Sequence, residues 1–125
     1  MEYDSLAEVP YDYAAVAPAG ATLFAAGACP LDAEGRVVGG TDYRAQAEKA
    51  IENLVTVLHV HHAGPEHLVK TTIYVVGGRQ DLVAVWDVVA SRLAPYRPPS
   101  TLLGVAMLGY QDQLVEIDGI AVLPA

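Results

Sequence analysis

Two carboxylates close together in one apolar stretch are the residues of this sequence best placed to do chemistry. Residues 114–122 alternate in character as a β-strand does, and Glu116 and Asp118 share one side with aliphatic residues. A charge is rarely set among apolar side chains without a partner or a function. Glu116 is the candidate general base, or the group that orients water against an sp² carbon. The alternative is a structural carboxylate bound by backbone amides or by another subunit.

Asp118 follows Glu116 by two residues, which is about 7 Å along a strand. Paired carboxylates can divide acid and base roles between them. The simpler prediction for Asp118 is a solvated or salt-bridged carboxylate.

A metal site is not expected. The four histidines, His59, His61, His62 and His67, lie at a predicted helix end, where no carboxylate or cysteine pattern completes a ligand set. The single cysteine, Cys29, excludes an internal disulfide, and no histidine or helix terminus is predicted beside it to activate the thiol. We therefore expect no metal and no organic cofactor.

Composition limits the partners. The 125 residues suit a single domain over 1–125, and seven basic against fifteen acidic residues give a net charge of −8. The basic residues are scattered, so a polyanion would be repelled and we expect no nucleic-acid binding. No stretch is long and apolar enough to span a membrane, and the acidic start lacks a signal-peptide pattern. We expect a cytoplasmic protein whose partner is a small molecule or another protein.

The chain must build a sheet and two helices around these residues. A strand over 21–26 is predicted to form a hairpin with 11–16. Helices are predicted from a Thr41-Asp42 cap to near Gly64-Pro65, and from an Asp81 cap to Pro95. Further strands are predicted at 36–38, 68–76, 101–107 and 114–122. This order predicts an α+β fold with one mixed β-sheet packed on two α-helices.

Two helices cover only one face of such a sheet. The other face would expose Leu114, Ile120 and Val122 from the last strand alone, and large exposed apolar patches are rare in monomers. We therefore expect identical subunits to bury these faces against one another, with Glu116 and Asp118 at or near the interface.

Several short motifs together resemble one known family. They are Ala26-Gly27-Ala28-Cys29-Pro30-Leu31-Asp32, Gln46 with Asn53-Leu54, Val69 to Val75, Pro99-Ser100-Thr101, and Val115 to Ala121. From about Tyr13 to Val122 the chain resembles the RidA/YjgF family. The resemblance implies a chorismate-mutase-like fold and a homotrimer with a ligand cleft between each pair of subunits. It also implies hydrolysis of reactive enamines and imines, released by pyridoxal-phosphate enzymes, to a 2-keto acid and ammonia.

Carried onto this chain, the resemblance places the water-activating glutamate at Glu116 and a cleft tyrosine at Tyr13. Backbone groups near Gly27, Ala28 and Cys29 would hold a polar atom. The arginine that grips a substrate carboxylate in deaminating members is replaced by Ser100, which has one donor and no charge. Arg97 is an alternative cation, but three residues displace it by roughly 10 Å on an extended chain.

The remaining candidates have structural alternatives. Ser100 and Thr101 would bind a polar ligand, or only begin a strand. Tyr13 would bind the ligand through its phenol, or be a half-buried strand residue. Trp86 lies on the apolar stripe of the second helix and would be core or a cleft wall.

The sequence thus predicts a RidA-like deaminase or hydrolase of an arginine-lacking subgroup. Its substrate would be an imine, an enamine or a similar electrophilic carbon, with Glu116 orienting water. The alternative is a non-catalytic trimeric protein that binds or senses a metabolite.

Overall fold

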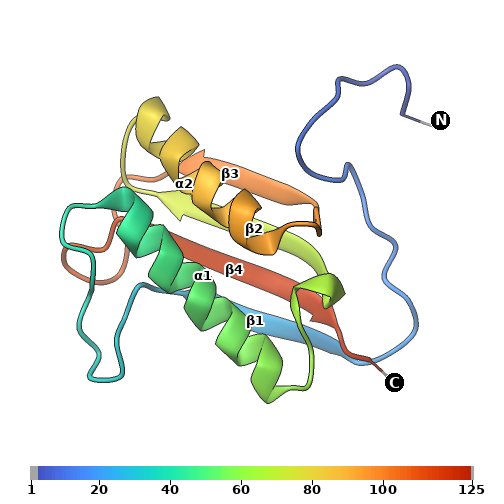
Figure 1. Ribbon diagram of the computed structural model, residues 1–125, viewed down its shortest axis with the longest axis horizontal. Coiled ribbons are helices and arrows are strands. Elements are labelled where there is room, and N and C mark those ends of the chain that lie inside the picture. Colours follow the sequence, from blue (N-terminus) through green and yellow to red (C-terminus); the bar gives the residue numbers. More distant parts are fainter. Residues whose placement is uncertain (1–2, 125) are drawn as a thin grey trace.

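The computed structural model describes residues 3–124 and places two helices on one face of a four-stranded sheet (Figure 1). In chain order the elements are β1 (Thr22–Ala28), α1 (Tyr43–Val60), a 3-10 turn (Pro65–His67), β2 (Leu68–Val75), α2 (Arg79–Leu93), β3 (Ser100–Gly104) and β4 (Val115–Val122). The sheet order is β1-β4-β2-β3, with β2 and β3 parallel and the other pairs antiparallel. The predicted mixed sheet with two helices is confirmed.

The first helix begins where the sequence predicts. The Asp42 side chain accepts hydrogen bonds from the backbone amides of Arg44 and Ala45, which satisfies two amides that lack helical partners. The predicted Asp81 cap of α2 is wrong by three residues, because Gly78 occupies the cap position. Asp81 lies in the first turn instead and accepts from the Gly78 amide at 2.9 Å.

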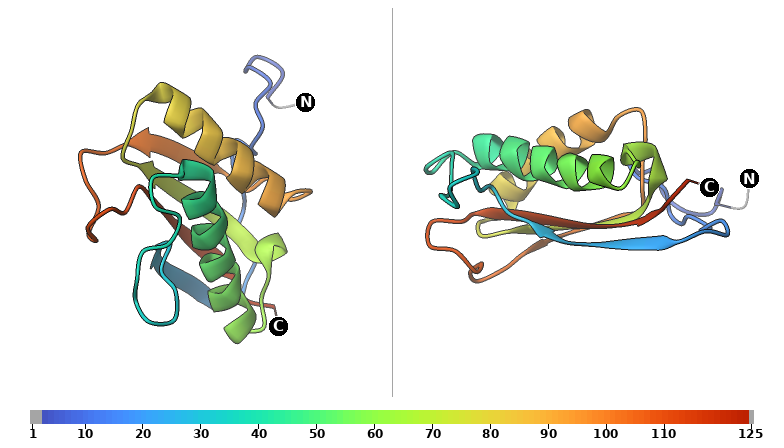
Figure 2. Two further views of the ribbon diagram at one scale, coloured as in Figure 1. Left: turned by 60° about the vertical axis from the view of Figure 1, so that its left-hand side comes forward. Right: turned by 90° about the horizontal axis from the view of Figure 1, so that it is seen from below.

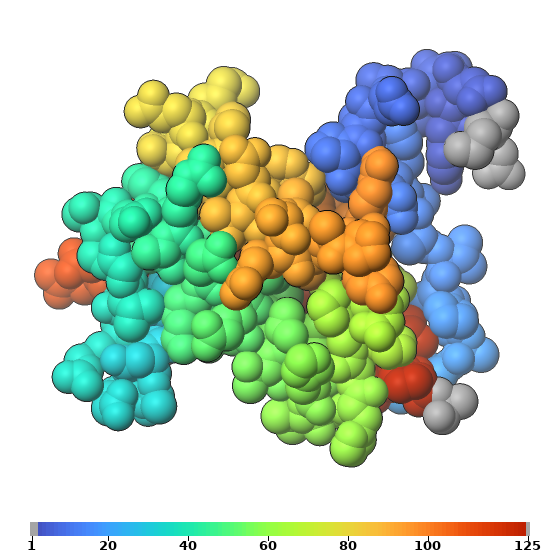
Figure 3. All heavy atoms as spheres, in the orientation of Figure 1, coloured from blue at the N-terminus to red at the C-terminus, as the bar shows by residue number. Residues whose placement is uncertain are grey.

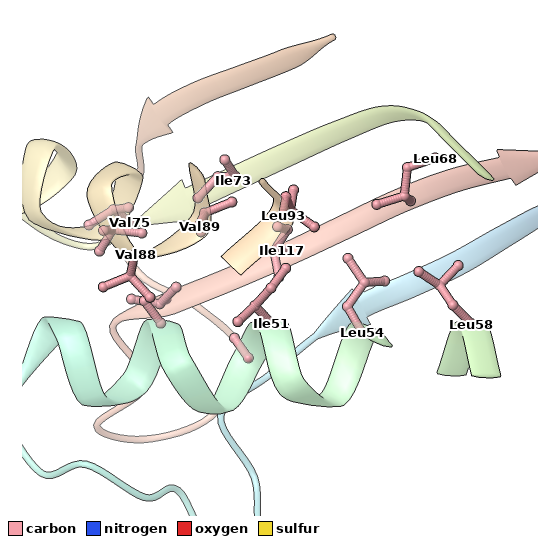
Figure 4. Packing of buried hydrophobic residues seen from close by; sticks show 14 of the residues in the cluster. Ile51, Leu54, Leu58, Leu68, Ile73, Val75, Val88, Val89, Leu93 and Ile117 are labelled. Carbon is pink, nitrogen blue, oxygen red and sulfur yellow. The ribbon is translucent and has the colours of Figure 1, made fainter. Parts of the chain in front are cut away.

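The core fills the space between the helices and the sheet (Figure 4). Ile51 and Leu54 of α1 face Ile73 of β2 and Ile117 of β4, and all four side chains are at most 1% exposed. Burying an aliphatic side chain of this size stabilises a fold by about 1.5–3 kcal/mol. This layer fixes which side of β4 faces the helices.

The opposite face of the sheet carries no helix (Figure 2). Along β4, Val115 and Ile117 are fully buried, whereas Glu116, Asp118 and Ile120 alternate with them and remain partly exposed. On β1, Phe24 is 73% exposed and pairs with Ile120. We call the sheet surface that carries Phe24, Glu116, Asp118 and Ile120 the open face.

The N-terminal hairpin prediction is wrong. Residues 11–16 form no strand, and β1 pairs with β4 instead. Prolines at 10 and 18 flank this segment, and they restrict the backbone and remove a donor. The segment instead lies beside the residues before β3 (Figure 3). There the Asp12 amide donates to the Arg97 carbonyl at 2.8 Å.

Two strand predictions are also corrected. Residues 36–38 contribute only a single bridge between Leu31 and Val37. The strand predicted over 101–107 runs from Ser100 to Gly104. Among residues 3–124, no helix has the length and apolar character needed to cross a bilayer.

Candidate active site

Glu116 lies at the beginning of β4, on the open face, beside the end of β1. Its Cα partner on β2 is Tyr74, and the next residue, Ile117, pairs with Ala28 of β1. Because Val115 and Ile117 are locked into the core, Glu116 must point away from the helices. The strand therefore fixes the carboxylate on the side where a ligand or another chain can approach.

Gly27 provides the space that the carboxylate occupies. The pairing of β1 with β4 shifts between Ala25 and Ala28, and such irregularities often re-aim side chains near functional sites. A Cβ atom at Gly27 would lie 2.0 Å from Oε2 of Glu116. Only a residue without a side chain permits this contact.

Cys29 lies against this carboxylate. Its Sγ lies 3.4 Å from Oε1 of Glu116 and 3.6 Å from the Gly27 carbonyl. Burial, together with the hydrogen bond and the charge of Glu116, raises the pKa of Cys29 to about 11. The raised pKa keeps the thiol protonated at and well above neutral pH, so it can donate to the carboxylate.

This protonation state predicts slow alkylation of Cys29. A rise in pKa from 9.0 to about 11 lowers the thiolate fraction at pH 8 about 100-fold. Iodoacetamide should therefore modify the folded protein about 100-fold more slowly than a small thiol, with the rate rising through pH 11. The pKa of the Cys29 thiol is higher in the folded chain than in the unfolded chain. Its contribution to the free energy of unfolding is therefore present below pH 9 and is lost as the pH rises through about 11. Rapid alkylation at pH 8 would contradict the contact.

Gln113 is a site residue that the sequence analysis missed. Its side chain is 3% exposed, and its Nε2 donates to the Val115 carbonyl at 3.1 Å and to Oε1 of Glu116 at 3.2 Å. In the sequence it is one more polar residue in a loop before a strand. No pattern in one sequence distinguishes such a residue from its exposed neighbours.

The Asp118 carboxylate binds a different partner from that of Glu116. Its Oδ2 accepts a hydrogen bond from the Tyr74 hydroxyl at 3.0 Å, and this bond is the main cause of the raised pKa of Tyr74. The predicted solvated or salt-bridged aspartate therefore has a phenol as its partner. Further along the open face, Lys70 donates to the Thr101 hydroxyl at 2.6 Å.

Ser100 points toward the other side of the sheet. Its hydroxyl lies 2.5 Å from that of Thr71, which is fully buried, and also donates to the Pro98 carbonyl at 2.9 Å. Since Thr71 faces the core, Ser100 and Glu116 of one chain occupy opposite faces. Arg97 is engaged as well, because its guanidinium donates to the carbonyls of Val9 and Tyr11.

The aromatic candidates gather around the N-terminal segment. Trp86 of α2 meets the Tyr11 ring edge-on at a centroid distance of 6.1 Å. Both rings, with Ser100 and Thr101, line a cavity of about 470 Å³. Tyr13 packs on Tyr3 and Tyr11, and its hydroxyl donates to the Ala7 carbonyl.

The predicted site residues thus form two groups within one chain. The first, which we call the carboxylate group, contains Gly27, Ala28, Cys29 and Glu116 at the β1–β4 junction. The second contains Trp86, Ser100 and Thr101 at the far edge of the sheet, with Tyr13 in the adjoining N-terminal segment. Within residues 3–124, no three His, Cys, Asp or Glu side chains gather in a way that could hold a metal ion.

Comparison with known proteins decides the family. The model of the family described as Endoribonuclease L-PSP matches residues 3–123. A RutC family protein of Synechocystis is 34% identical over 117 residues, which cover 92% of this chain and 87% of the relative. The chain belongs to the RidA/YjgF family.

Solved structures of this family share the fold described above. The Rid family protein YyfB from Yersinia pestis, whose function is described as unknown, superposes with a TM-score of 0.86 at 30% identity. The match covers 91% of this chain and 87% of that one. The chorismate-mutase-like fold implied by the sequence motifs is therefore confirmed.

A second relative by sequence, Protein DfrA of Myxococcus xanthus, is 33% identical over 113 residues, covering 90% of this chain and 85% of the relative.

Proposed function

We propose that the protein hydrolyses imines or enamines, with Glu116 orienting and deprotonating the attacking water. The observation that carries the proposal is a carboxylate fixed by the strand pattern on an exposed sheet face, against a glycine that leaves it room. Membership of the RidA/YjgF family supports the same chemistry.

The reaction needs no more than this carboxylate and a bound substrate. Water donates a hydrogen bond to Glu116, its oxygen adds to the carbon of a protonated C=N group, and the π electrons move to nitrogen. The proton lost by the water passes to Glu116 and then to the nitrogen of the carbinolamine. The C–N bond breaks as the C=O bond forms, and departing ammonia takes the hydroxyl proton as ammonium.

The substrate class follows from the residue that stands at the position of the family arginine. Ser100 stands in place of the family arginine, and its hydroxyl is bound to Thr71 and Pro98. Arg97 donates to backbone carbonyls. A substrate carboxylate would therefore lack the bidentate guanidinium partner that it binds best. We infer that the substrate is an imine or enamine without a carboxylate.

The cleft is completed by other copies of the chain. The cavities along the N-terminal segment do not include Glu116 among their lining residues, and the open face around Glu116 carries exposed apolar side chains such as Phe24. In the homotrimer that we propose, the carboxylate group of one subunit would meet Tyr13, Trp86, Ser100 and Thr101 of a neighbour.

Two imine classes test this proposal. A flavin amine oxidase generates a carboxylate-free imine from a primary amine, and an amino-acid oxidase generates a 2-imino acid. We expect the protein to accelerate hydrolysis of the first by about 10²- to 10⁴-fold and the second much less. The readout is the amount of imine captured by semicarbazide in the first seconds, with and without protein.

The relative rates for the two imines decide between the substrate classes. Equal or faster hydrolysis of the 2-imino acid would contradict the substrate class. If the protein accelerates the hydrolysis of neither imine, the proposed hydrolase activity is contradicted. The alternative, a trimeric protein that binds a metabolite without changing it, is then favoured. Thermal-shift screening of metabolites, followed by mass analysis of the recovered ligand, would then identify what is bound.

A further inference from the structure

The two oxygens of the Glu116 carboxylate have different surroundings. Both side-chain hydrogen bonds found for this carboxylate within residues 3–124 reach Oε1: one from Cys29 at 3.4 Å and one from Gln113 at 3.2 Å. Oε2 instead lies over Gly27, where there is no side chain. An oxygen that already accepts two hydrogen bonds has less lone-pair density left for a third donor.

The Gln113 amide is held in one orientation. Its Oε1 accepts from the Tyr110 backbone amide at 3.1 Å, so the carbonyl end must face Tyr110. Its Nε2 then has two N–H donors for two acceptors, the Val115 carbonyl and Glu116. Every polar atom of this buried side chain is thus used, and turning the amide over would break all three bonds.

Cys29, which directly follows β1, supplies the second donor, and its single S–H is nearer to Oε1 at 3.4 Å than to the Gly27 carbonyl at 3.6 Å. Its thiol stays protonated at neutral pH because burial and Glu116 raise its pKa to about 11. Residues from both sides of the β1–β4 junction therefore converge on one oxygen. A side chain that only filled space at this position would not need a hydrogen-bond donor.

We propose that Cys29 and Gln113 are positioning residues that hold Oε1 of Glu116, and that Oε2 is the oxygen that binds and deprotonates the attacking water. This inference rests on the proposed hydrolysis by Glu116. It adds which oxygen reacts, and it assigns roles to two residues that do not touch the reacting atoms. Oε2 gains the water proton as the new C–O bond forms, while Oε1 keeps its two donors throughout.

Four variants test the assignment on the amine-derived imine. Cys29→Ala and Gln113→Glu each remove one donor, and we expect kcat to fall about 10- to 100-fold with KM little changed. Cys29→Ser restores an O–H donor and should recover part of the loss. Gln113→Glu keeps the acceptor for the Tyr110 amide, and circular dichroism checks that the variant folds. Asp118→Asn, on the same face but bound to Tyr74, is the matched control and should retain kcat.

The pH dependence of kcat distinguishes a positioning role for Gln113 from a packing role. A carboxyl introduced by Gln113→Glu can donate to Oε1 only when it is protonated. The ratio of kcat for this variant to that of the wild type should therefore rise as the pH falls. The corresponding ratio for Cys29→Ala, which introduces no titratable group, should stay flat and is the control.

A readout independent of turnover comes from the single thiol. Glu116→Gln removes the charge that helps to raise the pKa of Cys29, so alkylation at pH 8 should become faster than in the wild type. Asp118→Asn should leave it unchanged.

The outcomes distinguish this inference from the function on which it rests. Unchanged kcat in Cys29→Ala and Gln113→Glu, with loss in Glu116→Gln, would overturn the positioning roles and leave the hydrolase intact. Full activity in Glu116→Gln, or no hydrolysis by the wild type, would overturn both.

Discussion

If the wild type is the homotrimer that we propose, replacing Phe24 by aspartate should leave single 13.2 kDa chains without activity on imines. Phe24 is 73% exposed in the isolated chain and pairs with Ile120 in the middle of the open face. An apolar ring in this position is what a second copy would bury. A charge there would have to be desolvated without a partner, which opposes association by several kcal/mol.

Sedimentation velocity at micromolar concentration measures this directly, and circular dichroism checks the fold. Val16→Asp is the matched control, because Val16 is 94% exposed but lies in the N-terminal segment outside the open face. We expect the wild type to have three times the mass of one chain, and the control should keep that mass and the activity. A Phe24→Asp variant that remains assembled and active would show that the open face is not the interface.

Replacing Gly27 by alanine should abolish most turnover while leaving the fold nearly as stable. The added methyl would lie 2.0 Å from Oε2 and 2.6 Å from the carboxyl carbon of Glu116. These atoms are the end of a flexible side chain, so the carboxylate swings away and the backbone stays in place. Misplacing a reacting group by about 1 Å can cost about 10²-fold in rate, so we expect kcat to fall by about that factor.

Gly109→Ala is the control for this substitution, since nothing lies within 4 Å of the Cβ it would add. Chemical denaturation should give similar free energies of unfolding for wild type and both variants. Wild-type kcat in Gly27→Ala would contradict the placement of the carboxylate. A large loss of stability would show that the strands, and not the carboxylate, absorb the clash.

The β4 pattern explains why much of the fold could be predicted. Alternation over 114–122 places Ile117 in the core and Glu116 opposite, and packing on two helices leaves no other arrangement. The hairpin at 11–16 failed because a short apolar segment between two prolines has no strong local preference. Its position depends on contacts with Arg97 that are distant in sequence.

The candidate site was predicted in part. Gly27 and Cys29 lie against Glu116 because β1 and β4 are neighbours, and the family motifs anticipated that. Gln113 could not be found, because its role depends on burial and on the turn at Tyr110. Tyr13 and Trp86 lie apart from Glu116 within one chain, so their roles depend on assembly and remain predictions.

The charge of the chain bears on the family description. The matching family model is described as an endoribonuclease, yet this chain carries seven basic and fifteen acidic residues. RNA-binding surfaces neutralise phosphates with clustered lysine and arginine. The proposed site instead presents the carboxylate of Glu116 on the open face, which supports a small neutral or cationic substrate.

The most direct measurement of the central claim is the rate of hydrolysis of an amine-derived imine by wild type and Glu116→Gln at equal concentration. Glutamine keeps the size of the side chain and removes its ability to accept the water proton. We predict that the variant sediments like the wild type and that its kcat falls about 10²- to 10⁴-fold. An assembled Glu116→Gln variant with wild-type kcat would contradict the claim that this carboxylate does the chemistry.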